Sequence, residues 1–148
     1  MKFTSWNCRG LGSKMKEDAI RDLIKITRID VLLIQETKMS QQDSLKVLKN
    51  VWRSSQGVAD NARGASGGLC TMWNVSKFDL IRSDLCMHWI CTQLLHKESG
   101  QTVSLFNIYV PQHIDEKRIC WQSIQDYLKE NELVNIILGG DLNVTLAA

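Results

Sequence analysis

A short, wholly apolar run from Val31 to Ile34 constrains the fold of this chain more than any other segment. Side chains alternate between the two faces of a strand, so four consecutive apolar residues place apolar side chains on both faces. Strands of this kind are covered on both faces, as in sheets packed between helices. We therefore expect the rest of the chain to supply amphipathic helices that pack on a sheet.

Three segments have the apolar periodicity and the start signals of amphipathic helices. The first follows Gly12 with Ser13 as its N-cap, the second begins at a capping-box-like Ser40-Gln-Gln-Asp43, and the third spans 115–131. Each has an apolar stripe. These stripes consist of Ile20, Leu23, Ile24 and Thr27 in the first helix, Leu45 and Leu48 in the second, and Cys120, Trp121, Ile124 and Leu128 in the third.

Strand patterns occupy most of the remaining chain, and residues 53–66 are polar enough to predict a loop. The expected strands are 2–7, 30–35, 68–74, 77–83, 87–96, 102–110 and 134–138. Turns are expected at Asn74-Val-Ser76 and Glu98-Ser-Gly100, and the last strand should be buried. The order strand–helix–strand–helix, meander, strand–helix–strand predicts an α/β fold with a mixed sheet and helices packed on it.

Length and composition fit one ordinary globular domain. The 148 residues are 44% apolar and 23% charged, and the net charge of +2 permits nucleic-acid binding without arguing for it. No apolar run is long enough to span a bilayer, and the N-terminus lacks the apolar stretch of a secretory signal. These observations predict an intracellular protein without a membrane partner.

Five scattered cysteines do not form a disulfide framework. Cys86, His88, Cys91 and His96 have metal-binding side chains, but their spacing matches no common zinc finger. The strand pattern also puts these side chains on both faces. We expect the cysteines to be small core or edge residues.

Four expected strands end in polar residues that could share one site. Asn7 ends the first strand, Glu36 follows the second, Tyr109 ends the strand over 102–110, and Asp141-Leu-Asn143 follows the last. Sites in α/β sheets form where strand ends and their loops converge. Asp141 and Asn143 are two apart and lie on one face of an extended segment. Carboxylate and amide oxygens suit Mg²⁺, which needs only one or two protein carboxylates.

Each of these residues also has an ordinary structural explanation. A glutamate at a strand end is usually solvated, and Asn7 and Asn143 could stabilise turns with their side chains. Tyr109 could be a core residue with a satisfied hydroxyl, and Gly139-Gly140 could form a tight turn. Neither this glycine pair nor the Gly64–Gly68 segment is followed by the Lys and Ser or Thr of a Walker phosphate loop. The combination of residues carries the functional prediction.

In order along the chain, five motifs resemble those of the endonuclease/exonuclease/phosphatase superfamily. They are Trp6-Asn-Cys-Arg-Gly-Leu-Gly12, Ile34-Gln-Glu-Thr-Lys38, Ser66-Gly-Gly-Leu69, Asn107-Ile-Tyr-Val-Pro111 and Leu138-Gly-Gly-Asp-Leu-Asn143. The first motif and the later segment Gly139-Gly-Asp-Leu-Asn-Val-Thr-Leu146 look most like the endonuclease domain of plant non-LTR (LINE-type) retrotransposon polyproteins. The resemblance implies a four-layered, DNase I-like α/β sandwich with mixed sheets, of which 1–148 would be the N-terminal part.

This resemblance implies divalent-metal-dependent hydrolysis of phosphodiesters, with DNA as substrate and Mg²⁺ or Mn²⁺ as cofactor. Glu36 would be the main metal ligand, and Asn7 would assist at the metal or the phosphate. Tyr109 would contact the scissile phosphate, Asp141 would orient or deprotonate the attacking water, and Asn143 would hold phosphate oxygens. Lys38 and Arg9 would be further phosphate contacts. The parent polyprotein would supply a reverse transcriptase partner and act in the nucleus.

The family also has a C-terminal Asp-His motif, which this chain lacks. His88, His96 and His113 all precede Asp141, so none of them matches that histidine by position. We therefore expect an incomplete domain with little or no activity on its own. Two alternatives stay open at this point: a phosphatase or phosphodiesterase of the same superfamily, and a non-catalytic remnant.

Overall fold

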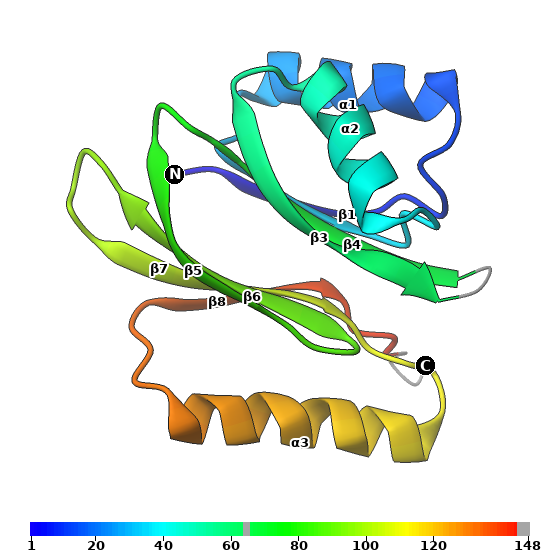
Figure 1. Ribbon diagram of the computed structural model, residues 1–148, viewed down its shortest axis with the longest axis vertical. Coiled ribbons are helices and arrows are strands. Elements are labelled where there is room, and N and C mark those ends of the chain that lie inside the picture. Colours follow the sequence, from blue (N-terminus) through cyan, green and yellow to red (C-terminus); the bar gives the residue numbers. More distant parts are fainter. Residues whose placement is uncertain (64–65, 145–148) are drawn as a thin grey trace.

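The computed structural model describes residues 1–63 and 66–144, which form four layers (Figure 1). Helices α1 and α2 cover the outer face of one sheet, the second sheet packs against its inner face, and α3 covers the far side. This arrangement is the layered α/β sandwich that the sequence predicts. In chain order the elements are β1 (Phe3–Asn7), α1 (Lys14–Thr27), β2 (Val31–Gln35), α2 (Gln41–Val51), β3 (Ser55–Arg63), β4 (Ser66–Asn74), β5 (Phe78–Leu85), β6 (Trp89–His96), β7 (Thr102–Tyr109), α3 (Ile114–Glu130) and β8 (Ile136–Asp141).

Each sheet has four strands and mixes parallel and antiparallel pairs. The strand orders are β1-β2-β4-β3 and β5-β6-β7-β8. Within them, β1 pairs with β2 and β7 pairs with β8 in parallel. Parallel neighbours need a crossover connection, which α1 and α3 supply. The carboxyl ends of each parallel pair therefore point the same way, and these are the polar ends that the sequence analysis singled out.

Helix starts follow the sequence signals closely. The Ser13 side chain accepts a hydrogen bond from the Lys16 backbone at 3.3 Å, and Ser40 accepts one from the Asp43 backbone at 3.1 Å. Each serine therefore satisfies an N–H group that has no partner within its helix. Among the residues that the structure describes, no helix has the length and apolar character needed to cross a membrane.

The prediction of a loop over residues 53–66 was wrong, because Ser55–Arg63 forms β3. This strand is the edge of its sheet, and only Ser55 and Ala59 are buried along it. The other positions are partly or fully exposed, so polar side chains can occupy them. The order of elements alone predicted one mixed sheet, whereas the strands form two mixed sheets, as the family resemblance implied. The turn at Asn74-Val-Ser76 connects β4 to β5, which lie in different sheets and do not pair.

The last strand was predicted to be buried, and this was wrong, because every residue of β8 is exposed or only partly buried. Ile136 and Leu138 are 44% and 49% exposed. Strand β8 is the edge of its sheet, and α3 packs mainly over β6 and β7 through Cys120 and Ile124. Ile137, on the opposite face, packs between the two sheets. Gly139 and Gly140 also belong to this strand and do not form a tight turn.

Three apolar clusters hold the layers together. One lies between α1, α2 and the first sheet, a second lies between the two sheets, and a third lies between α3 and the second sheet. Cys8, Cys70, Cys91 and Cys120 are buried free thiols, as expected for small core residues. Burial raises the pKa of Cys91 and of Cys120 to about 11, so both stay protonated thiols near neutral pH.

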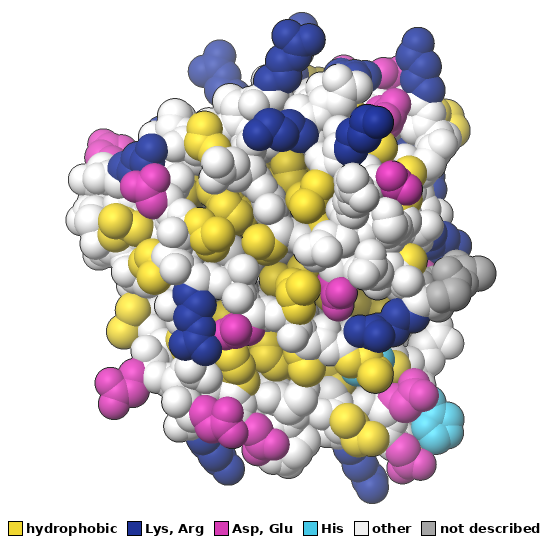
Figure 2. All heavy atoms as spheres, in the orientation of Figure 1, with side chains coloured by type: hydrophobic (Ala, Val, Ile, Leu, Met, Phe, Trp, Pro, Cys, Tyr) yellow, Lys and Arg dark blue, Asp and Glu magenta, His cyan; other side chains and the backbone are white. Residues whose placement is uncertain are grey.

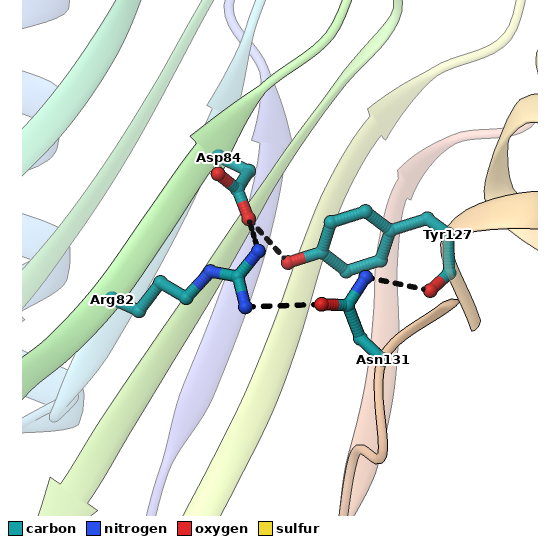
Figure 3. A network of polar contacts seen from close by, with 4 residues as sticks. All are labelled: Arg82, Asp84, Tyr127 and Asn131. Atoms are coloured by element: carbon teal, nitrogen blue, oxygen red, sulfur yellow. Dashed lines mark hydrogen bonds and ion pairs between the residues drawn. The ribbon is translucent and has the colours of Figure 1, made fainter. Parts of the chain in front are cut away.

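A polar network fixes the C-terminal end of α3 to β5 (Figure 3). The Tyr127 hydroxyl donates to Asp84 Oδ2 at 2.6 Å, and Arg82 forms an ion pair with the same oxygen at 2.8 Å. Arg82 also donates to Asn131 Oδ1 at 3.0 Å, and the Asn131 side chain donates to the Tyr127 carbonyl at 2.9 Å. Helix α3 ends at Glu130, and Asn131 is its C-cap with extended backbone.

Candidate active site

The chain after β1 continues to pair with the chain after β2, which brings two predicted site segments together. Cys8 N donates to Gln35 O at 3.1 Å, and Gly10 N donates to Glu36 O at 2.6 Å. From α1, Lys16 Nζ donates to the carbonyls of Cys8 and Arg9 at 2.5 and 2.9 Å. These contacts hold Asn7 and Glu36 at the same edge of the first sheet.

A third segment, Gly67-Gly68, supports the other side of Glu36. Thr37 N donates to Gly68 O at 3.1 Å, and Lys38 N donates to Gly67 O at 2.9 Å. Gly68 has φ +89°, and a Cβ atom there would lie 2.1 Å from Thr37 Oγ1. Only glycine lets the β4 backbone approach the Glu36 segment this closely.

The two sheets meet at this edge through a direct side-chain contact. Asn7, from the first sheet, donates through Nδ2 to Asp141 Oδ2 of the second sheet at 2.8 Å. The other Asp141 oxygen accepts from the Asn143 backbone N–H at 3.0 Å. Asn143 is itself held by its side chain, which donates to Val110 O, and by Lys117, which donates to the Asn143 carbonyl at 2.7 Å. Three predicted site residues are therefore joined in one network.

Tyr109 connects this network to Glu36. Burial raises the pKa of the Tyr109 hydroxyl, and the charge of the Glu36 carboxylate and its hydrogen bond with that hydroxyl raise it further. A hydrogen bond from Asn143 partly offsets this rise. The phenol therefore stays protonated near neutral pH and donates its proton toward Glu36. With Asn7 and Asp141, these residues place two carboxylates, two amides and a phenol at one end of the sandwich.

A buried pair of amides lies directly below the site, and sequence reasoning assigned it no role. Asn107 is fully buried, and its Oδ1 accepts from Gln35 Nε2 at 2.8 Å. Asn107 Nδ2 also donates to the carbonyls of Ile34 and Cys70 at 3.2 and 3.0 Å. Asn107 stands in the otherwise apolar run Leu105-Phe-Asn-Ile108, where a buried amide must find partners. A single amide within an apolar strand is the sequence signal that could have identified Asn107.

Strained backbone conformations are concentrated at the end of the sheets where the candidate site lies. Four of the six non-glycine residues with positive φ in the described part of the chain belong to the predicted site. Their φ angles are 51° at Arg9, 55° at Glu36, 55° at Lys38 and 46° at Asn143. Left-handed backbone costs about 1–3 kcal/mol for ordinary residues and tends to occur at functional sites. The surrounding hydrogen bonds maintain these conformations.

The two basic residues of the prediction are near the site but are not joined to its side-chain network. Arg9 and Lys38 are exposed, and in residues 1–63 and 66–144 neither forms an ion pair. Their backbones take part in the edge, since Arg9 N donates to Asn7 Oδ1 at 3.1 Å. The structure therefore brings five of the seven predicted residues together and leaves two charged side chains at the rim.

The donor set at this edge fits a hard divalent cation. Within the described residues, no three His, Cys, Asp or Glu side chains form a group that could hold a metal ion. One or two carboxylates are enough for Mg²⁺, which keeps several of its waters. Both Asp141 oxygens already accept hydrogen bonds, whereas Glu36 is engaged by Tyr109. Glu36 therefore has the greater remaining capacity to bind a cation.

Solved structures with the same fold cover nearly all of this chain. Humanized D. rerio TDP2 with 14 mutations has a TM-score of 0.75 at 18% identity, and the match covers 97% of this chain and 66% of that chain. An endonuclease/exonuclease/phosphatase from Bacteroides vulgatus gives 0.77 at 16% identity, with 97% and 66% covered. The mannosyl-6-phosphatase Bt3783 of Bacteroides thetaiotaomicron gives 0.71 at 16% identity, with 96% and 65% covered.

These likenesses establish the fold, and the chain spans slightly less than two thirds of the length of each of the three structures. No curated protein sequence matches it. At the level of sequence, the profile of the Endonuclease/Exonuclease/phosphatase family matches residues 4–148. The chain belongs to the Endonuclease/Exonuclease/phosphatase family.

Proposed function

We propose that this chain carries the metal- and phosphate-binding part of a divalent-metal-dependent phosphodiesterase. The observation that carries the proposal is the convergence of Glu36, Tyr109 and the Asn7–Asp141–Asn143 network at one edge of the sandwich. Cleavage of a phosphodiester requires an aligned water and groups that stabilise negative charge developing on the phosphate oxygens. Family membership supports the same class of reaction.

The roles of the side chains follow from their hydrogen-bonding capacity. Asp141 is held by Asn7 and by the Asn143 backbone, which makes it suited to orient an attacking water and accept its proton. Tyr109 keeps its proton and can donate to a phosphate oxygen. The Asn143 side chain can provide a further donor, and Arg9 and Lys38 at the rim can attract the substrate backbone.

Mg²⁺ or Mn²⁺ is the cofactor that suits this oxygen-rich edge, with Glu36 as its main ligand and Asn7 beside it. A bound divalent ion would supply charge stabilisation at the phosphoryl oxygens. Both Asp141 oxygens accept hydrogen bonds. We therefore propose that Glu36 binds the cation and that Asp141 orients the attacking water.

DNA is the substrate that we propose, on the likeness of Trp6–Gly12 and Gly139–Leu146 to LINE-type endonucleases. Such an enzyme would nick chromosomal DNA in the nucleus and leave a 3′ hydroxyl to prime a reverse transcriptase in the parent polyprotein. On the face shown in Figure 2, basic and acidic side chains are mixed over the helices. The net charge of the whole chain is only +2, so DNA binding would rely on local contacts at the site more than on a broad basic surface.

A phosphatase of the same family is the second candidate, and it is favoured by the structural likeness to a mannosyl-6-phosphatase. The two reactions differ in the substrate, because a phosphatase acts on a terminal phosphomonoester. Release of inorganic phosphate from sugar phosphates, without nicking of DNA, would select this candidate. A chain that neither binds a cation nor cleaves either substrate would be the non-catalytic remnant.

The decisive experiment combines plasmid nicking with metal binding. The chain is incubated with supercoiled plasmid and Mg²⁺, beside Glu36→Gln, Asp141→Asn and the exposed control Glu98→Gln. Nicking that falls at least about 100-fold in both site variants and is unchanged in the control would show that the chain is active through these residues, against the expectation of little or no activity. Nicking that survives in both site variants would show that these residues do not carry the reaction.

Metal binding provides a second measurement that does not depend on turnover. Mn²⁺ broadens the amide NMR signals of residues near its binding site, so residues around Glu36 should broaden first at low Mn²⁺. Glu36→Gln should abolish this selective broadening, while Glu98→Gln should leave it intact. Uniform or absent broadening in the wild-type chain would rule out the proposed cation site.

A further inference from the structure

A cavity of about 270 Å³ opens beside Tyr109 and has no part in the function proposed above. Its described lining comes from three separate segments: the hairpin formed by β3 and β4, the connection between β5 and β6, and the chain that follows β7. Tyr109 lines this cavity and is also a neighbour of Glu36, so the cavity lies next to the candidate active site.

The walls of the cavity combine apolar surface with uncharged hydrogen-bonding groups. Leu69, Met87 and Pro111 provide apolar surface, and Asn61 and Gln112 provide amides. Leu69 and Pro111 are buried, whereas Met87 is 59% exposed and lies at the rim. Binding sites for organic ligands usually combine apolar walls with a few polar groups, and cavities near 300 Å³ are at the small end of their range. The cavity therefore suits a single flat ring system.

The charges that line the cavity do not favour a second phosphate. Arg63 forms an ion pair with Asp60 at 3.7 Å. Burial lowers the pKa of His88, and nearby Arg63 lowers it further although Glu116 acts in the opposite direction, so the imidazole is mainly neutral at pH 7. Glu116 adds a negative charge to the lining. The sum of these charges is not positive, which disfavours a phosphorylated headgroup or a polyphosphate.

We propose that this cavity binds the nucleobase of a nucleotide whose phosphate lies at the Glu36–Asp141 edge. The inference rests on the proposed function, because it assigns the base that flanks the phosphate. A nucleobase has flat apolar faces that match Met87 and Pro111, and polar edges that match the amides of Asn61 and Gln112. Tyr109 separates the base site from the phosphate site.

The test compares two ligands of equal phosphate charge, adenosine 5′-monophosphate and ribose 5-phosphate. Each is titrated without metal into the ¹⁵N-labelled chain, and affinities are read from amide NMR shifts. We expect adenosine monophosphate to bind at least about tenfold more tightly and to shift the amides of Met87, His88 and Gln112. An affinity ratio below tenfold, or shifts confined to other parts of the chain, would overturn the proposal.

Shortening the Met87 side chain at the rim of the cavity tests the base site, and a second methionine variant serves as its control. Met87→Ala should reduce the affinity ratio at least about threefold, because it removes apolar surface from the base site. Met15→Ala is the control, since Met15 is 77% exposed on α1 and does not line the cavity. An equal ratio in Met87→Ala and Met15→Ala would contradict the assignment. The NMR spectra also report whether each variant is folded.

The cavity proposal and the proposed function can fail separately. Glu36→Gln should leave the ratio between the two ligands unchanged, because the base site does not include Glu36. Metal-dependent nicking with an affinity ratio near one between the two ligands would contradict the base site and agree with the phosphodiesterase proposal. A tenfold affinity ratio without nicking and without Mn²⁺ binding would contradict the phosphodiesterase proposal and agree with the base site.

Discussion

At the scale of single residues, the two tyrosines have hydroxyl groups held in protonated form by burial and by neighbouring carboxylates. Burial raises the pKa of Tyr109, and the Glu36 carboxylate raises it further; burial and Asp84 do the same for Tyr127. The folded chain therefore keeps both phenol protons at a pH where the unfolded chain, with phenol pKa values near 10, has begun to lose them. This stabilisation is complete below about pH 10 and is lost as the pH rises above it.

This linkage predicts that less tyrosinate absorbance near 295 nm appears around pH 10 in the folded chain than in the unfolded chain. The chain has only these two tyrosines, so the signal is simple to assign. The midpoint of phenolate absorbance in the folded chain should therefore lie above pH 10. A tyrosine that ionises with a midpoint near 10 in the folded chain would contradict the prediction, and Tyr109→Phe and Tyr127→Phe would identify which one it is.

Asn107 illustrates a residue whose role depends on contacts that the sequence does not contain. Its side chain joins β7 to β2 and β4 across the interior, directly below the candidate site. Asn107→Ala should lower the free energy of unfolding by about 2–4 kcal/mol, because it leaves Gln35 and two buried carbonyls without this partner. Asn50→Ala, at an exposed position of α2, should change it by less than about 0.5 kcal/mol. Urea denaturation of both variants measures the difference, and similar values for the two would show that Asn107 does not bridge the sheets.

At the scale of elements, sequence periodicity predicted all three helices and most strands, because each has an apolar stripe or a start signal of its own. Strand β3 was missed because an edge strand carries polar residues at many positions. The separation of β4 and β5 into two sheets was missed because a short turn does not reveal whether the strands beside it pair. The polar strand ends were identified individually, but the Asn7–Asp141 contact spans 134 positions and depends on how the two sheets pack.

Strand β8 reaches the site because Gly140 allows β7 and β8 to approach closely. Gly140 has φ +140°, and a Cβ atom there would lie 1.9 Å from the Ile108 carbonyl oxygen. Gly140→Ala should therefore cost more than about 3 kcal/mol of stability and displace Asp141. Gly100→Ala is the matched control, since Gly100 also has positive φ (+70°) but no atom within 4 Å of the added methyl group. Thermal unfolding should show a cost near 1 kcal/mol for the control. Equal costs would mean that backbone strain alone, without the clash, explains the role of Gly140.

At the scale of the whole molecule, both sheets present an unpaired edge strand on the same side. Strands β1 and β8 are the ends of their sheets, and they lie next to each other. On β8, Ile136 and Leu138 add exposed apolar surface to this edge. Unpaired strands with exposed apolar side chains tend to associate with other chains. We therefore expect the 148-residue chain to self-associate through β8 as its concentration rises.

Sedimentation velocity over a range of concentrations tests this expectation against a monomer mass of 16.9 kDa. The wild-type chain should show a concentration-dependent increase in mass, which the double variant Ile136→Lys/Leu138→Lys should reduce, because charged side chains on an edge strand oppose pairing. Met15→Lys/Ile26→Lys is the matched control, since it changes two apolar residues that are 77% and 79% exposed on α1. If the control reduces association as much as the β8 variant does, net charge governs the association. If the wild-type chain remains a monomer at every concentration, the β1–β8 edge does not mediate self-association. The adjacent site residues Asn7 and Asp141 then stay accessible to substrate throughout the concentration range.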